Sequence, residues 1–157
     1  MCTIRNDSEQ VAMPKDEIKK KIVQGMKAAG LKLTSQRLAI IDFLAGTRSH
    51  PSAAATLAAA KKSAPSISLS TVYLTLDALK RAGLIKELEF DDRDSRYEGD
   101  VSDHLNLVCQ RCGAIEDFHA VLPVPAERIE KRTGFKVSGV RLEYYGHCRR
   151  CLPVKTA

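Results

Sequence analysis

Cys109-Gln-Arg-Cys112 and Cys148-Arg-Arg-Cys151 are two C-x-x-C turns separated by 35 residues. Two thiolates at this spacing can occupy two corners of a tetrahedron from one tight turn, so two such turns complete a four-cysteine zinc site. A site of this kind has no open coordination position and is therefore structural. The separation exceeds that of a compact zinc ribbon, so the intervening residues must fold and return to the first turn.

Disulfides and redox chemistry are the other common uses of paired cysteines. A redox C-x-x-C is single and lies in a βαβ setting, whereas this chain has two such pairs. Disulfides need an oxidising compartment, and no apolar signal segment follows Met1. The sequence therefore favours zinc-bound thiolates and a cytoplasmic location. Cys2 lies apart from the two pairs and is interpreted as incidental.

The distribution of charge along the 157 residues points to the first part of the chain as the part that meets a polyanion. Residues 1–90 contain 14 Lys and Arg against 8 Asp and Glu, whereas residues 91–157 contain 11 of each. The whole net charge of +6 therefore lies in the first ninety residues. A solvated basic face is the alternative. Trp is absent and aromatic residues make up 5%, which argues against a single-strand binder built on base stacking.

Helical patterns dominate the chain as far as residue 83. They begin at Asp16, at Thr34 or Ser35, near residue 52 and at Ser68, and they end at Gly30, near Gly46, near residue 62 and at Gly83. The last helix, Ser68–Ala82, has two contrasting faces at 100° per residue. Its apolar face, which we expect to be buried, carries Leu69, Val72, Leu76 and Leu79. Its opposite face carries small or uncharged residues and one basic residue: Ser70, Thr71, Leu74, Ala78 and Arg81.

A strand and a hairpin partner follow these helices. Residues 84–90 alternate as a strand, residues 91–94 form an acidic turn, and residues 95–98 return. Helices followed by a hairpin predict a winged helix-turn-helix in which Ser68–Ala82 reads DNA. An ordinary helical bundle with a hairpin is the alternative.

The remaining sequence predicts a second, smaller domain. On a strand that ends at Cys109, Leu105 and Leu107 face one way while His104 and Asn106 face the other. A strand over 114–119, a helix over 126–133 and a strand over 137–145 complete this part. The predicted fold class is α+β: a winged-helix domain over 15–98, a hinge over 99–103, and a zinc-clamped α/β domain over 104–152.

Several separated motifs occur together in this chain. They are Gly-Leu-Lys-Leu-Thr-Ser-Gln-Arg (30–37), His-Pro-Ser-Ala (50–53), Ser-Thr-Val-Tyr (70–73), Asp103-His104 ahead of Cys109-x-x-Cys112-Gly113, and Cys148-x-x-Cys151. In this order and spacing the chain resembles the ferric uptake regulator (Fur) family of bacterial metal-dependent repressors, over about residues 17–152. The resemblance implies a homodimer with an N-terminal DNA-binding domain and a C-terminal dimerisation domain. It also implies a structural zinc ion and a regulatory metal at the hinge.

The same resemblance implies which residues bind the regulatory metal. They are His50, Glu98, His104 and Asp117, and Asn106 stands where the family usually has the second histidine of a His-x-His pair. A set of imidazoles and carboxylates suits Fe²⁺ or Mn²⁺, whereas thiolates suit zinc. Taken singly, His50 could be an ordinary surface or cap residue and His104 a core histidine.

We therefore predict a metal-dependent transcriptional repressor, most similar to the peroxide-sensing (PerR) branch because of Asp117, although Glu98 resembles the other sensors. Peroxide would release it by oxidising the metal ligand His50 or His104. The predicted DNA contacts are Ser70, Thr71, Tyr73, Leu74 and Arg81. Leu74 departs from the Arg or Asn common at this position in the family. An iron- or manganese-sensing repressor without peroxide chemistry is the alternative.

Two other classes of function are less well supported by the sequence. A zinc hydrolase needs three protein ligands and an open position, which four cysteines do not leave, so we expect no enzyme. A zinc-stabilised interaction module would not require the N-terminal charge excess. The expected partners are double-stranded operator DNA and a second copy of the chain, with no membrane and no small-molecule substrate other than peroxide.

Overall fold

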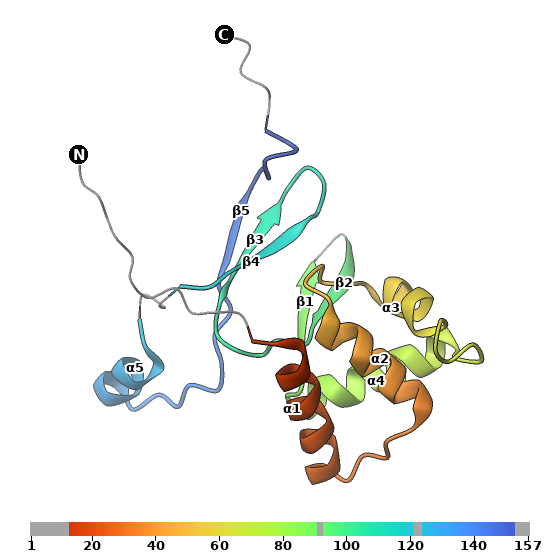
Figure 1. The fold of residues 1–157 in the computed structure, drawn as a ribbon. Coiled ribbons are helices and arrows are strands. Elements are labelled where there is room, and N and C mark those ends of the chain that lie inside the picture. The colour runs from red at the N-terminus through yellow and green to blue at the C-terminus, as the bar shows by residue number, and fades with distance from the viewer. Residues whose placement is uncertain (1–12, 91–92, 121–123, 153–157) are drawn as a thin grey trace. The chain divides into compact units, whose positions relative to one another are not determined.

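A computed structural model describes residues 13–90, 93–120 and 124–152 of the chain. These residues form two compact units, one over Met13–Ser102 and one that begins at Asp103 (Figure 1). The first unit contains helices α1–α4 and strands β1 and β2, and the second contains β3, β4, α5 and β5. The mixed α+β class predicted from the sequence is confirmed. Cys2 lies outside the described residues.

Four helices build the N-terminal unit: α1 (Lys15–Ala28), α2 (Ser35–Gly46), α3 (Ala53–Ala60) and α4 (Leu69–Arg81). The hydroxyl oxygens of Thr34, Ser52 and Ser68 each accept a hydrogen bond from the backbone N–H three residues later. These bonds satisfy amides that have no partner within the first turn of a helix. Of the two caps proposed for α2, Thr34 is the one that forms.

Two glycines follow the first and the last helix of this unit. Gly30 after α1 and Gly83 after α4 have φ angles of 68° and 67°. This left-handed conformation is strained for residues with a Cβ atom, and it lets the chain turn directly after a helix. Both ends were predicted from the sequence.

The helices enclose an apolar core. Its most completely buried side chains are Ile22, Met26, Ile40, Ile41, Leu44, Val72, Leu76 and Leu79. The prediction that Leu69 belongs to the buried face of α4 is wrong, since its side chain is 42% exposed. Leu69 is the first residue of α4 and lies at the end of the helix, and Ile67, just before the helix, packs into the core instead.

Strands β1 (Lys86–Phe90) and β2 (Arg93–Glu98) form the antiparallel hairpin that follows α4. Lys86 lies opposite Glu98, and the register shifts between Leu88 and Phe90. Residues 91–92 of the predicted acidic turn lie outside the described residues. Residues 93 and 94 belong to β2 rather than to the turn, because the register shift lets the strand begin earlier than its alternation indicates. Helices followed by this hairpin give the winged helix-turn-helix arrangement.

The second unit is a three-stranded sheet with one helix. Strand β3 (Leu105–Cys109) lies between β4 (Ile115–Phe118), which is antiparallel to it, and β5 (Glu143–Gly146), which is parallel. Helix α5 (Ala126–Thr133) lies in the connection that a parallel pair requires. The predicted strand over 137–145 is only partly correct, since residues 137–142 are irregular. Only Glu143–Gly146 pair with β3, and before them a single bond joins the two segments, from the N–H of Asn106 to the carbonyl of Leu142.

Among the described residues of this unit, few apolar side chains are buried. Its buried apolar side chains are Val108, Cys109, Ile115 and Cys151. Its exposed large apolar side chains are Phe118, Val124, Phe135, Val140, Tyr144, Tyr145 and Leu152. Such a unit is too small to be stable through its core alone, so it requires further support. Within the described part of the chain, no helix has the length and apolar character needed to cross a membrane.

Candidate metal sites and nucleic-acid interface

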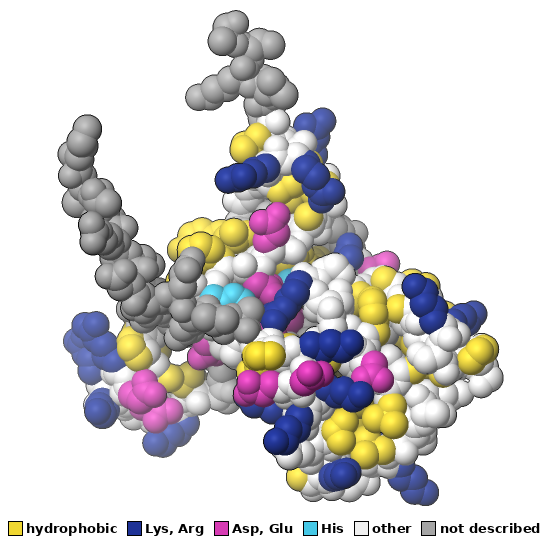
Figure 2. All heavy atoms as spheres, viewed as in Figure 1, with side chains coloured by type: hydrophobic (Ala, Val, Ile, Leu, Met, Phe, Trp, Pro, Cys, Tyr) yellow, Lys and Arg dark blue, Asp and Glu magenta, His cyan; other side chains and the backbone are white. Residues whose placement is uncertain are grey.

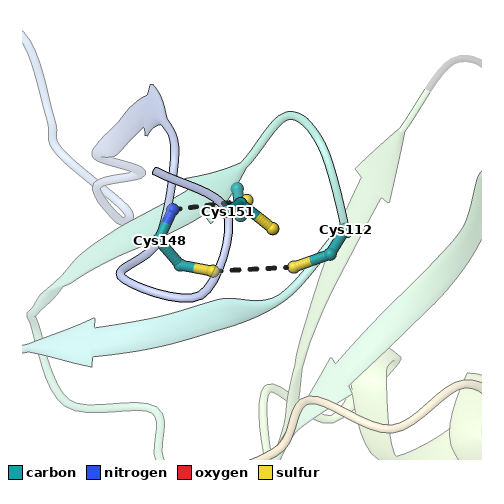
Figure 3. Close-up of side chains that lie close together, drawn as sticks. Cys112, Cys148 and Cys151 are labelled. Atoms are coloured by element: carbon teal, nitrogen blue, oxygen red, sulfur yellow. Dashed lines mark hydrogen bonds between the residues drawn. The ribbon is translucent and has the colours of Figure 1, made fainter. Parts of the chain in front are cut away.

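Four cysteine side chains meet at one end of the three-stranded sheet. Cys109 ends β3, Cys112 lies in the turn after it, and Cys148 and Cys151 follow β5. Because β3 and β5 are parallel neighbours, with Cys109 opposite Gly146, the two C-x-x-C turns emerge side by side (Figure 3). The four sulfur atoms lie within 4.8 Å of one another. The pairing of parallel strands thus brings together turns that are 35 residues apart in sequence.

The distances between these sulfur atoms fit a tetrahedral zinc ion. The Sγ atoms of Cys112 and Cys148 are 3.7 Å apart, far beyond a disulfide bond, and all four thiols are free. Four sulfurs at about 2.3 Å from a central zinc ion would lie roughly 3.8 Å from one another.

The surroundings of Cys109 favour its thiolate form, whereas those of Cys151 favour its thiol form. Backbone N–H groups of Cys148 and Cys112 lower the pKa of Cys109 to about 5. Burial, together with the neighbouring cysteines, raises the pKa of Cys151 to about 12. A divalent cation would stabilise all four thiolates at once.

His50 and Glu98 form the half of the predicted regulatory site that lies in the N-terminal unit. The Nε2 atom of His50 is 3.8 Å from a carboxylate oxygen of Glu98, and both side chains are buried. The backbone of His50 has a φ angle of 48°. This left-handed conformation costs roughly 1 kcal/mol for a residue other than glycine. The fold therefore maintains a strained turn that points an imidazole toward a carboxylate.

His104 and Asp117 form the other half, in the C-terminal unit. The Nε2 atom of His104 is 3.8 Å from a carboxylate oxygen of Asp117. Asn106 lies directly opposite Asp117 in the pairing of β3 and β4, so the two side chains leave the sheet on the same face. Neither half by itself offers more than two charged or imidazole ligands from the predicted set.

His119 was not identified from the sequence. Its ring stacks on that of His104, with centroids 5.1 Å apart and ring planes at 25°. A signal was present, because His119 follows Asp117 by two residues and therefore shares its face of the strand. The contact fixes the plane of the His104 imidazole.

The predicted DNA-contacting residues lie on α4. Tyr73 and Leu74 are 53% and 70% exposed, and Ser70 and Arg81 are exposed as well. Thr71 is half-buried, and its hydroxyl is hydrogen-bonded to that of Ser68 at the helix start. These residues present a short face on which two large side chains, Tyr73 and Leu74, are exposed beside small polar ones, as expected for a helix that enters a major groove.

A groove of about 370 Å³ lies between α4 and the segment before α2. Lys32 and Arg37 line it together with Thr71 and Leu74, and Arg37 donates a hydrogen bond of 2.8 Å to the carbonyl of Lys32. These two basic residues were not predicted as DNA contacts, although both lie within the 30–37 motif. On the face drawn in Figure 2, Lys and Arg side chains are interspersed with acidic ones over the N-terminal helices. The groove thus brings two basic side chains next to two of the predicted DNA contacts, Thr71 and Leu74.

A sequence profile described as the ferric uptake regulator family matches residues 28–145. The chain belongs to the ferric uptake regulator family. It is 38% identical over 133 residues to the peroxide operon regulator of Bacillus subtilis (strain 168), covering 84% of this chain and 92% of that protein. It is 35% identical over 130 residues to the peroxide-responsive repressor PerR of Staphylococcus epidermidis, covering 82% and 87%.

Solved structures of Fur-family members share the fold. The Campylobacter jejuni peroxide stress regulator has a TM-score of 0.66 at 30% identity, covering 87% of this chain and 97% of that one. The Helicobacter pylori ferric uptake regulator has a TM-score of 0.69 at 22% identity, covering 94% and 99%, which is a likeness of fold. The relatives named here are regulators of gene expression by name.

Cys112→Ser should unfold the C-terminal unit of this Fur-family chain or prevent its self-association, because one ligand of a structural ion would be lost. Metal analysis should find one tightly held zinc ion per wild-type chain and much less in the variant. Cys2→Ser, which removes a cysteine outside the four, should retain the metal. A stable, fully associated protein that contains no zinc would contradict the assignment.

Leu74→Ala should weaken specific DNA binding by about 1 kcal/mol, the scale of an apolar contact with a thymine methyl group. The measurement is anisotropy on a duplex selected from a randomised pool by the metal-loaded wild type. Replacing thymidine by deoxyuridine in that duplex should weaken wild-type binding and leave the variant unchanged. Equal losses on random DNA would indicate misfolding, and no loss would exclude the contact.

Proposed function

We propose that this chain is a cytoplasmic, metal-dependent transcriptional repressor that binds operator DNA as a homodimer and is released by peroxide. The observation that carries the proposal is the pairing of an imidazole with a carboxylate in each unit, His50 with Glu98 and His104 with Asp117. Family membership and the peroxide-responsive relatives support the same function.

The structural metal is zinc, held by Cys109, Cys112, Cys148 and Cys151. The separation of the sulfur atoms and the soft thiolate set both support this ion. Its role is to fasten the turn after β3 to the end of β5, in a unit that has little apolar core.

The regulatory metal is Fe²⁺ or Mn²⁺, bound jointly by His50, Glu98, His104 and Asp117, with the amide oxygen of Asn106 as a further ligand. Two imidazoles and two carboxylates are a nitrogen and oxygen set suited to these ions. Because each unit contributes only a pair, the ion binds well only when both pairs meet. Metal binding therefore favours one arrangement of the two units, and operator DNA that selects this arrangement tightens metal binding by the same factor.

A second copy of the chain is the partner expected for the C-terminal unit. Helix α5 has no buried residue, and Phe135, Tyr144 and Tyr145 are 66%, 62% and 55% exposed. Exposed apolar side chains at this density are typical of an interface. A two-fold dimer would present two α4 helices to two half-sites of operator DNA. Ser70, Thr71, Tyr73, Leu74 and Arg81 are the proposed contacts.

Peroxide release follows from the identity of the ligands. Fe²⁺ in this site would lend one electron to cleave the O–O bond of hydrogen peroxide, and the oxidised imidazole would return that electron to the iron. Overall, a ring carbon of His50 or His104 would exchange its C–H bond for a bond to one peroxide oxygen, the second peroxide oxygen would leave as water, and the oxidised ring would no longer bind metal. The arrangement favoured by metal is then lost, and with it DNA binding. The alternative within the family is an iron or manganese sensor that is insensitive to peroxide.

Peroxide should release the Fe²⁺-loaded protein from its selected duplex and add the mass of one oxygen to a peptide that contains His50 or His104. Protein is loaded anaerobically, treated with peroxide, and analysed by anisotropy and peptide mass. Protein loaded with Mn²⁺, which reduces peroxide far less readily, should stay bound and unmodified. Metal-dependent binding with no histidine oxidation in the Fe²⁺ sample would favour the alternative.

Asn106→His should tighten Mn²⁺ binding by roughly tenfold, because imidazole donates to a metal more strongly than a neutral amide does. Isothermal titration measures the change directly. Leu107→His, which adds an imidazole to the opposite face of the same strand, should have no effect. Equal affinity in the wild type and Asn106→His would remove residue 106 from the site.

A further inference from the structure

Hydrogen bonds to the backbone connect the His50–Glu98 pair to the β1–β2 hairpin, the wing of the winged helix-turn-helix. Glu98 is the last residue of β2, and the N–H of the preceding residue, Tyr97, donates a 3.0 Å hydrogen bond to the carbonyl of Pro51. Arg96 donates from its side chain to the carbonyl of His50. The segment that carries one metal ligand is thus bonded to the strand that carries the other. A movement of either ligand moves the end of β2.

The same strand reaches α4 through Glu87, a carboxylate on β1 whose partner on α4, Lys80, also pairs with the more exposed Glu89 at 3.0 Å. Tyr97 and Glu87 are cross-strand partners, and the Tyr97 hydroxyl donates a 3.2 Å hydrogen bond to Glu87. The other oxygen of Glu87 forms an ion pair with Lys80, near the end of α4, and Ser95 also bonds to this carboxylate. The Glu87 side chain is 14% exposed, so these contacts are better shielded from water than an ordinary surface ion pair.

The pKa of Glu87 agrees with these close contacts. Contacts with Lys80, Ser95 and Tyr97 outweigh the opposing effect of burial and lower the pKa of Glu87. The carboxylate therefore stays ionised at neutral pH, which is the form that the ion pair with Lys80 requires.

We propose that Glu87 is a positioning residue that transmits occupancy of the His50–Glu98 pair to the reading helix through Tyr97 and Lys80. This inference rests on the proposed regulatory site and adds a route that runs wholly inside the N-terminal unit. Metal that draws His50 and Glu98 together steadies the end of β2. Glu87 then holds the wing and the C-terminal end of α4 in one arrangement, and the face that carries Leu74 becomes ordered before DNA arrives.

Glu87→Gln tests this route, because it keeps the size of the side chain and removes the charge. Asp42→Asn is the matched control. It neutralises a carboxylate paired with a lysine in the same unit, Lys19 at 2.6 Å, and that pair joins α1 to α2. Both variants lose one negative charge, so any general increase in DNA affinity is the same in the two and cancels in their comparison. Tyr97→Phe, which removes only a hydroxyl group, serves if Glu87→Gln fails to fold.

The readout is amide hydrogen exchange of residues 69–81, with and without Mn²⁺, in dimeric full-length protein without DNA. Mn²⁺ should slow exchange in the wild type and in Asp42→Asn, and this gain should be lost in Glu87→Gln while Mn²⁺ affinity by calorimetry is unchanged. The Mn²⁺-dependent gain in affinity for the selected duplex should fall by roughly fivefold or more.

Two outcomes would overturn the inference, and they are distinguishable. If Mn²⁺ binds and slows exchange of α4 equally in Glu87→Gln and the wild type, Glu87 is only a structural link and the proposed function stands. If the wild type binds no Mn²⁺ beyond its zinc, the regulatory site fails and this route fails with it.

Discussion

Four sulfur atoms within 4.8 Å of one another are the constraint on which the C-terminal unit depends. Burial, together with the neighbouring cysteines, disfavours the thiolate of Cys151 and raises its pKa. A zinc ion bound by all four cysteines would offset this cost and would join the turn after the central strand β3 to the end of β5. The few buried apolar side chains of the unit, and the many exposed ones, are explained if an ion and a second copy supply what the core does not.

The N-terminal unit is stabilised differently. Its helices bury a continuous apolar core and begin with hydroxyl caps at Thr34, Ser52 and Ser68, so it requires no ion to fold. That independence leaves His50 and Glu98 available for a regulatory purpose. A metal bound there would change an arrangement rather than create a fold, which is what the proposed reversible control of DNA binding needs. The two proposed metals would thus have different roles, and the ligand sets proposed for them differ accordingly.

Only part of the proposed regulatory site lies in either unit. His50 and Glu98 belong to one, while His104, Asn106 and Asp117 belong to the other. A divided ligand set makes affinity for metal depend on conformation, and linkage then makes affinity for DNA depend on metal. The bonds from Pro51 through Tyr97 and Glu87 to Lys80 give that dependence a physical route within the N-terminal unit.

The sequence alone predicted helices α1–α4 and the cluster of four cysteines. Periodicity, hydroxyl caps and glycines predicted helices α1–α4, and the C-x-x-C spacing identified the four cysteines, because these signals are local. The tertiary structure decided what depends on neighbours that are distant in sequence. Leu69 lies outside the core because the helix begins there, the pairing with β3 covers only Glu143–Gly146, and His119 stacks on His104 where β3 begins and β4 ends. The Lys80–Glu87–Tyr97 contacts were equally invisible, because they require α4, β1 and β2 to meet in space.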